Sequence, residues 1–199
     1  MPGVPQAQVT LHPGLEPVLR EVGEVPPGPF VPARFQVEAL EAVRRGDVLL
    51  TEISVGYHGY TGQILRPFVF GEPPTAHYQR LYDVAVAAYQ RIFAVLRPGA
   101  TAADVVAAAD LILEEGFTTY DDLLHGYVGG YLEPILQTRD RLHRPVPEFV
   151  FQENMTVVIQ PNVITRDETA GVQVGQLVRI THDGAESLHQ FLMELMQCG

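Results

Sequence analysis

The sequence predicts an α+β fold, because strand-like and helix-like segments occur in separate blocks along the chain. Two extended runs come first, two helical runs follow them, and the last third is again rich in strand patterns. The chain has 199 residues, 46% of them apolar and 19% charged, which is typical of a globular domain able to bury a sizeable core.

The first 31 residues contain seven of the chain's 16 prolines. Proline fixes φ and removes a backbone donor, so residues 1–31 are predicted to form an extended arm or the remnant of an upstream segment. A short helix is expected at about 35–45. Residues 32–199 are predicted to form the folded domain.

A hairpin is the first predicted element of that domain. Residues 48–55 and 62–70 are rich in β-branched and aromatic residues, and Gly56 and Gly59 lie in the connection between them. The clearest helix follows, with Thr75 as its N-cap and apolar residues at helical spacing as far as Leu96. A second helix is predicted from Thr101, with Asp104 in the capping-box position, as far as Gly116.

The last third is predicted to be mostly strand. Residues 126–132 are glycine-broken and extended, and 156–160 and 177–181 are β-branched runs bounded by turn residues. Asp183-Gly184 is typical of a tight hairpin turn. Residues 193–196 are expected to form an apolar C-terminal helical turn.

Composition excludes several classes of function. All 13 basic residues are arginines, so lysine-based chemistry is excluded. A net charge of −11 without basic clusters argues against nucleic-acid and anionic-membrane binding. No apolar run reaches the length of a membrane span, and no secretory signal pattern opens the chain. Cys198 is the single cysteine, which excludes a disulfide framework and favours the cytoplasm.

Five motifs occur in a characteristic order, at 46–52, 59–66, 97–101, 125–129 and 155–161 together with 171–175. On these motifs the chain resembles the family of creatinase, prolidase, aminopeptidase P and methionine aminopeptidase over about residues 30 to 196. The resemblance implies a pita-bread fold, shortened here because a proline-rich stretch replaces an initial helical segment.

The family's peptidases hold two divalent metals on two Asp, one His and two Glu. By the same resemblance, the family's second catalytic His falls on Leu132. The five ligand positions fall, in order, on Glu52, Gln63, His125, Gln160 and Gly175.

This ligand set is degenerate. Two divalent ions carry four positive charges, whereas Glu52 is the one carboxylate left at these positions. At ~4 Å, each uncompensated charge pair is worth about 4 kcal/mol even at an effective dielectric of 20. The amides of Gln63 and Gln160 are neutral and also carry donors. The sequence therefore predicts no dinuclear metal centre and no cofactor.

Three functions compatible with this site are considered. The first is a non-catalytic pseudoenzyme that binds a peptide or small ligand. The alternative is a metal-independent, creatinase-like hydrolase of a small C–N-bonded substrate, with His125 as acid/base and Glu52 assisting. A weaker alternative is a residual Xaa-Pro-type metallopeptidase that holds one metal on Glu52 and His125.

Several further residues are expected to complete the site. Gln63 and Gln160 can donate and accept at once, and Arg66 is expected to pair with Glu52 from the facing strand. Tyr60, Tyr127 and Tyr131 could line a cleft or serve as strand aromatics. Because the shortened fold should leave apolar surface uncovered, a homodimer or a hetero-complex is also expected.

Overall fold

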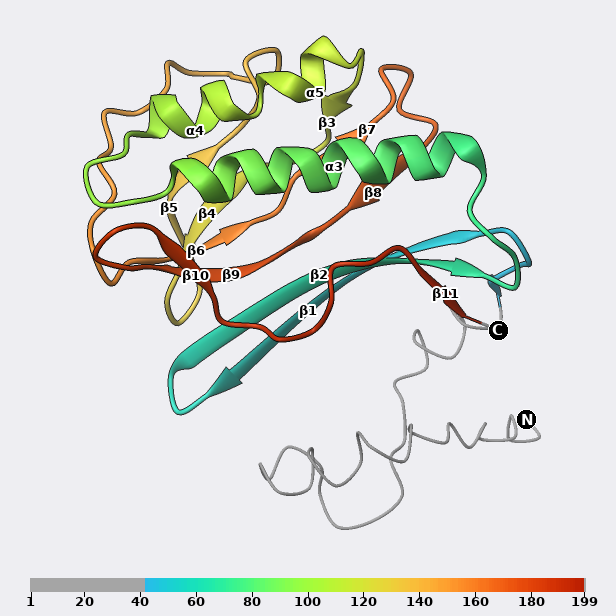
Figure 1. Cartoon of the computed structure of the whole chain (residues 1–199), viewed down its shortest axis with the longest axis horizontal. Helices are drawn as coiled ribbons and strands as arrows, with labels where there is room; N and C mark the ends of the chain where they lie inside the picture. Colours follow the sequence, from blue (N-terminus) through green and yellow to red (C-terminus); the bar gives the residue numbers. More distant parts are fainter. Residues whose placement is uncertain (1–41, 199) are drawn as a thin grey trace, which may run out of the picture. The chain divides into compact units, whose positions relative to one another are not determined.

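The computed structural model describes residues 42–198, and the chain divides into two units, Met1–Arg44 and Arg45–Gly199. Strands β1 to β11 and helices α3 to α5 all lie in the second unit (Figure 1). The arm predicted at 1–31, and most of the helix predicted at 35–45, fall outside the described residues. No helix in the described part of the chain is long and apolar enough to cross a membrane.

The predicted hairpin is confirmed and is longer than the sequence pattern indicated. Strand β1 (Val48–Tyr57) pairs antiparallel with β2 (Tyr60–Phe70) over its whole length. The turn lies at His58 and Gly59, which both adopt positive φ. Glycine reaches that region without steric cost, which explains its place there.

The helical block is confirmed with one difference. Helix α3 (Ala76–Val95) begins after Thr75, whose side chain accepts a hydrogen bond from the Tyr78 N–H. The second predicted helix is divided into α4 (Ala102–Ala108) and α5 (Asp110–Glu114). At the break the Ile112 N–H bonds three residues back to the Ala109 carbonyl, which tightens the chain locally.

The last third holds the remaining strands, with two corrections. Residues 126–132 reverse direction instead of running on, because Gly129 and Gly130 take positive φ between β4 and β5. The helical turn predicted at 193–196 is wrong: residues 193–195 belong to no helix or strand, and Met196 begins a strand at 196–198 that pairs parallel to β2. The strands are β3 (Thr118–Thr119), β4 (Leu124–Tyr127), β5 (Tyr131–Leu136), β6 (Thr156–Ile159), β7 (Asn162–Ile164), β8 (Gly171–Gln173), β9 (Gly175–Ile180), β10 (Ala185–Ser187) and β11 (Met196–Cys198).

Two sheets result. The large sheet has the order β1-β2-β9-β6-β4-β5, with β10 paired to β9 and β11 to β2, and the small one has the order β3-β7-β8. The large sheet curls, since a Cβ built on Gly129, in the β4–β5 turn, would lie 3.6 Å from the Gly59 carbonyl oxygen in the β1–β2 turn. Hairpins from opposite ends of the strand order therefore approach each other.

The two faces of the large sheet have different partners. Helices α3, α4 and α5 cover one face (Figure 1), where Leu124, Ile159 and Val178 join the main apolar core with the helices. The opposite face, called the inner face below, carries a small separate cluster of Leu65, Val158 and Leu177. Because side chains alternate along a strand, every second residue of each central strand belongs to the inner face.

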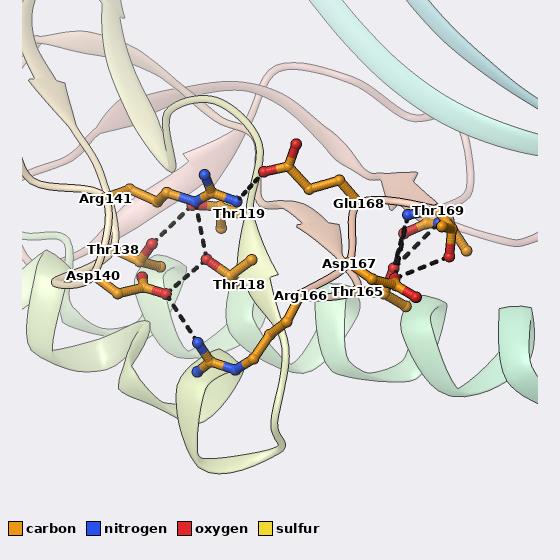
Figure 2. Close-up of polar contacts among 11 residues, drawn as sticks. Thr118, Thr119, Thr138, Asp140, Arg141, Thr165, Arg166, Asp167, Glu168 and Thr169 are labelled. Carbon is orange, nitrogen blue, oxygen red and sulfur yellow. Dashed lines mark hydrogen bonds and ion pairs between the residues drawn. The ribbon is translucent and has the colours of Figure 1, made fainter.

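A polar network ties the small sheet to the loop after β5 (Figure 2). The Thr118 hydroxyl donates to Asp140 (2.8 Å), and Arg141 contacts both Thr118 and Glu168. Thr119 and Thr138 share a hydrogen bond of 2.8 Å. This group of side chains, called the threonine network below, connects β3 to the β7–β8 turn.

Candidate functional site

The five degenerate ligand positions lie on, or directly after, five neighbouring strands of the large sheet. In spatial order they occur on β1, β2, β9, directly after β6, and on β4, so that one position comes from each strand. The strand order brings these positions onto neighbouring strands, although the first and last of them are more than 100 residues apart in sequence. The positions are Glu52, Gln63, Gly175, Gln160 and His125.

Strand register places these positions on the inner face. Glu52 is opposite Leu65, which is opposite Gly175 on β9. Directly paired residues share a face, as do residues two apart on one strand. Gln63 lies two residues before Leu65 on β2 and therefore shares its face. His125 is opposite Val158, and Gln160 lies two residues after Val158, so both share the face of Val158. The sequence-predicted positions are thus brought to one surface.

Glu52 is held by two amides. It is exposed on the edge strand β1 and accepts a short hydrogen bond from Gln63 Nε2. Gln173 Nε2, on β8 of the small sheet, lies 3.5 Å from its second oxygen. Gln63 is buried, so the pair joins an exposed carboxylate to a buried amide. Gln173 was not singled out from the sequence.

Asp122 adds a carboxyl group that the sequence reading missed. It is fully buried, and its Oδ1 accepts a 2.7 Å hydrogen bond from Gln160 Nε2. Burial raises the pKa of Asp122, and the nearby Tyr131 and His125 side chains offset that rise only in part. The available signal was an acidic residue directly before the apolar pair Leu123-Leu124, because a buried carboxyl group needs a partner.

His125 is buried with one ring nitrogen free. Its Nδ1 lies 2.9 Å from the Gly126 carbonyl oxygen, which can only accept, so Nδ1 carries the proton in the neutral ring. Nε2 is therefore an acceptor. The ring stacks on Tyr131 (centroids 3.9 Å apart) and meets Tyr127 edge-on (5.4 Å). Burial, together with the Asp122 charge, raises the pKa of Tyr131, so its hydroxyl keeps its proton.

Gly175 has no room for a side chain. A Cβ at this position would lie 2.2 Å from the Ile159 carbonyl oxygen and 2.8 Å from Gln160 Cα. The glycine lets β9 approach the end of β6 closely, as expected where two backbones meet. A glutamate cannot occupy this ligand position unless the backbone moves.

Arg66 does not join this group, and the expected ion pair with Glu52 is wrong. Arg66 is opposite Thr51, one residue from Glu52, so its side chain lies on the helix-covered face. There its guanidinium donates to Gln176 Oε1 (2.6 Å) and to carbonyl oxygens. Those carbonyls belong to Leu65, Gly175, Phe191 and Leu192.

Two other positions lie at the margin. Tyr60, expected to bind ligand, is 78% exposed at the tip of the β1–β2 hairpin and is not brought together with the other site residues. Leu132, at the position of the family's second catalytic His, is half exposed on β5, opposite Gly126. A leucine there can neither donate nor accept a proton.

These side chains do not fit a dinuclear metal centre. Glu52 and Asp122 are each hydrogen-bonded to an amide donor, and backbone closes the fifth position. Within residues 42–198 no group of three His, Cys, Asp or Glu side chains is placed to hold a metal ion.

Comparison with known proteins identifies the family of the chain. The model of metallopeptidase family M24 matches residues 30–182, and the chain belongs to that family. The Xaa-Pro dipeptidase of Pyrococcus furiosus is 28% identical over 159 residues, which is 77% of this chain and 43% of that protein.

Solved structures show the same fold. Dipeptidase PepE from Mycobacterium ulcerans matches with a TM-score of 0.68 and 26% identity, over 78% of this chain and 41% of that one. Methionine aminopeptidase from Rickettsia prowazekii matches with a TM-score of 0.62 and 22% identity, over 73% and 65%. The chain has the pita-bread fold of this family and spans about two fifths of the length of the dipeptidases it matches.

Proposed function

We propose that this chain is a non-catalytic member of family M24 that binds a peptide or small ligand on the inner face of its large sheet. The observation that carries the proposal is Gly175. Its Cβ position is filled by the backbone of Ile159 and Gln160, so the last metal-ligand position is closed as well as substituted. Without that carboxylate, two divalent ions lack the charge they need.

The remaining polar groups suit recognition. Gln63 and Gln160 are buried amides, each anchored to a carboxylate, and His125 stands between two tyrosine rings. Anchored side chains lose little further freedom when a ligand binds, which favours affinity. The names of the relatives suggest Xaa-Pro dipeptides as the first ligands to test.

The test separates binding from turnover. The protein is titrated by calorimetry with Xaa-Pro dipeptides, and the same samples are analysed for free amino acids, with and without Mn²⁺. Binding without product is expected. Product formed only with Mn²⁺ would favour the residual metallopeptidase and contradict the proposal.

A metal-independent hydrolase is the second candidate, and His125 favours it. The free Nε2 acceptor of a neutral histidine can serve as a general base. If a C–N-bonded substrate such as creatine is hydrolysed without metal, His125→Ala should lower the rate by about 10²- to 10⁴-fold. Unchanged turnover in that variant would exclude His125 as the base.

Assembly with a partner is also proposed. Strand β1 is an edge strand of the large sheet. Its residues Ile53, Val55 and Tyr57 lie on the face opposite the inner face, and each is more than half exposed. Exposed apolar side chains on a sheet edge favour pairing with another chain. Light scattering should show a species larger than the monomer, and a monomer at all concentrations, with no co-purifying partner, would contradict this.

A further inference from the structure

A segment near the C-terminus is held against the helix-covered face of the large sheet. Residues 188–195, called the strap below, connect β10 to β11 and belong to no helix or strand (Figure 1). Arg66 on β2 donates to two strap carbonyl oxygens, those of Phe191 (2.9 Å) and Leu192 (2.8 Å). The Tyr82 hydroxyl on α3 donates to a third (2.7 Å). These hydrogen bonds fix the second half of the strap.

The first half of the strap contains a histidine with a buried, unpaired ring nitrogen. His189 Nε2 has no hydrogen-bond partner among the described residues. The ring packs over β2 at Gly62, where a Cβ would lie 3.8 Å from His189 Cε1 and 3.3 Å from Val55 Cγ2. A protonated imidazole carries an N–H donor on both nitrogens. Protonation would therefore leave a charged donor buried without an acceptor, which is costly.

The charge beneath the strap is positive. Arg66 is 3% exposed, and its guanidinium donates to carbonyl oxygens and to the Gln176 amide oxygen. Within the described residues it forms no ion pair with a carboxylate. Burial lowers the pKa of His189 and the Arg66 charge adds to this, whereas a hydrogen bond to the β2 backbone offsets part of it. A second positive charge is therefore disfavoured in the docked strap.

The other titratable groups packed near the strap supply no counter-charge. Tyr82 and Tyr89 on α3 keep their protons, because burial raises the pKa of both hydroxyls. The carboxylates of Glu194 and Asp83 act on Tyr82. Glu186 on β10 is paired with an arginine on β9 (2.8 Å). A protonated histidine in the docked strap thus gains no partner.

We infer that the strap is an acid-sensitive latch, in which protonation of His189 releases residues 188–195 from β2 while the rest of the domain stays folded. The released histidine binds a proton more tightly than the docked one. Docking is therefore complete above the ordinary histidine pKa of about 6.5 and weakens as the pH falls below it. The equilibrium constant for release should rise by up to about tenfold per pH unit in that range.

Hydrogen exchange on the purified full chain measures the release. The Leu188 N–H donates to the Leu177 carbonyl oxygen, and the His189 N–H donates to the Ser187 hydroxyl. Both amides should lose protection between pH 7.5 and pH 5.5, after correction for intrinsic exchange, whereas the amides of α3 should keep theirs. Equal protection of the strap at both pH values would overturn the inference. Loss of protection in the strap and α3 together would mean global acid unfolding and would also overturn it.

Variants identify the group that titrates. His189→Asn keeps a side-chain N–H donor but gains no proton in this range, so the strap should stay docked at both pH values. His182→Asn, in the exposed turn between β9 and β10, is the matched control and should keep the native pH dependence. Unchanged pH dependence in His189→Asn would assign the release to another group and contradict the latch.

A direct titration keeps the inference testable if His189→Asn fails to fold. In the native chain, the ring signals of His189 followed by nuclear magnetic resonance should titrate at lower pH than those of His182, because a buried ring resists protonation. Titration of His189 at the same pH as His182, or at a higher one, would overturn the inference.

Discussion

The threonine network and the inner-face site are both polar clusters with buried members, but they differ in how fully their groups are paired. Thr118, Thr119 and Thr138 are at most 3% exposed, and each hydroxyl has a partner (Figure 2). In the inner-face site, Gln63 Oε1, His125 Nε2 and Gln160 Oε1 have no hydrogen-bond partner in the described chain. A satisfied cluster contributes to folding, whereas an unsatisfied one is expected where a ligand binds.

The largest effect is expected at Gly175. Gly175→Glu places a side chain against the Ile159 carbonyl and the Gln160 backbone, so it should destabilise the protein by about 3 kcal/mol or more. Urea denaturation with circular dichroism measures the change. Gly184→Ala, at a glycine whose Cβ would meet no atom within 4 Å, is the control and should change little. A stable Gly175→Glu protein that binds Mn²⁺ would show that the site can still be metallated.

Asp122 and Asp140 should respond oppositely to the same substitution. Because burial raises the pKa of Asp122, the folded state holds that proton to higher pH than the unfolded state. Stability is therefore lost as pH rises from about 4, the unfolded value, through the folded pKa. Asp122→Asn removes this loss and should stabilise the protein at pH 7 but not at pH 3.

Asp140→Asn is the matched change in the threonine network. Asp140 accepts from Thr118 and lies 3.6 Å from Arg166, so its loss of charge should cost up to about 1 kcal/mol. Thermal unfolding of both variants across pH 3–8 measures whether each substitution stabilises or destabilises the protein. Destabilisation by both substitutions at pH 7 would mean that the inner-face carboxyl is as well paired as the network carboxyl.

The smallest effect concerns the threonine pair. Thr119→Val leaves the Thr138 hydroxyl without its partner, and should cost about 1 kcal/mol. The double variant Thr119→Val/Thr138→Val removes both groups and should recover most of that loss. A double-mutant cycle by chemical denaturation tests this, and simple additivity of the two single losses would contradict a satisfied pair.

Much of the fold could be predicted because local patterns agree with it. Thr75 and the Thr101–Asp104 box mark the helix starts, and the glycine between two β-branched runs marks the first hairpin. A helical turn was predicted at 193–196 in place of the start of β11, because the pairing of Met196–Cys198 with β2 depends on residues 68–70, far away in sequence. Short apolar runs leave helix and strand undecided until such partners are known.

The shared face of the five positions could be predicted, but the contacts of their side chains could not. The resemblance to known proteins identified the positions that share the inner face, whereas Arg66 was assigned to the wrong face because its register is one residue from that of Glu52. Asp122 and Gln173 were missed because their contacts with Gln160 and Glu52 cross between distant segments. The closure of Gly175 depends on the approach of two backbones, which composition does not encode.

The anchoring of Arg66 has a consequence for the order of folding. Its guanidinium contacts the carbonyls of Phe191 and Leu192, about 125 positions later, and β2 pairs with β9 and with β11 near the end of the chain. Because β9 and β11 follow β2 by more than 100 residues, we expect the β2 edge to stay unpaired during synthesis until those segments have been made. Such long-range pairing slows folding, and an unpaired strand edge favours aggregation in the meantime.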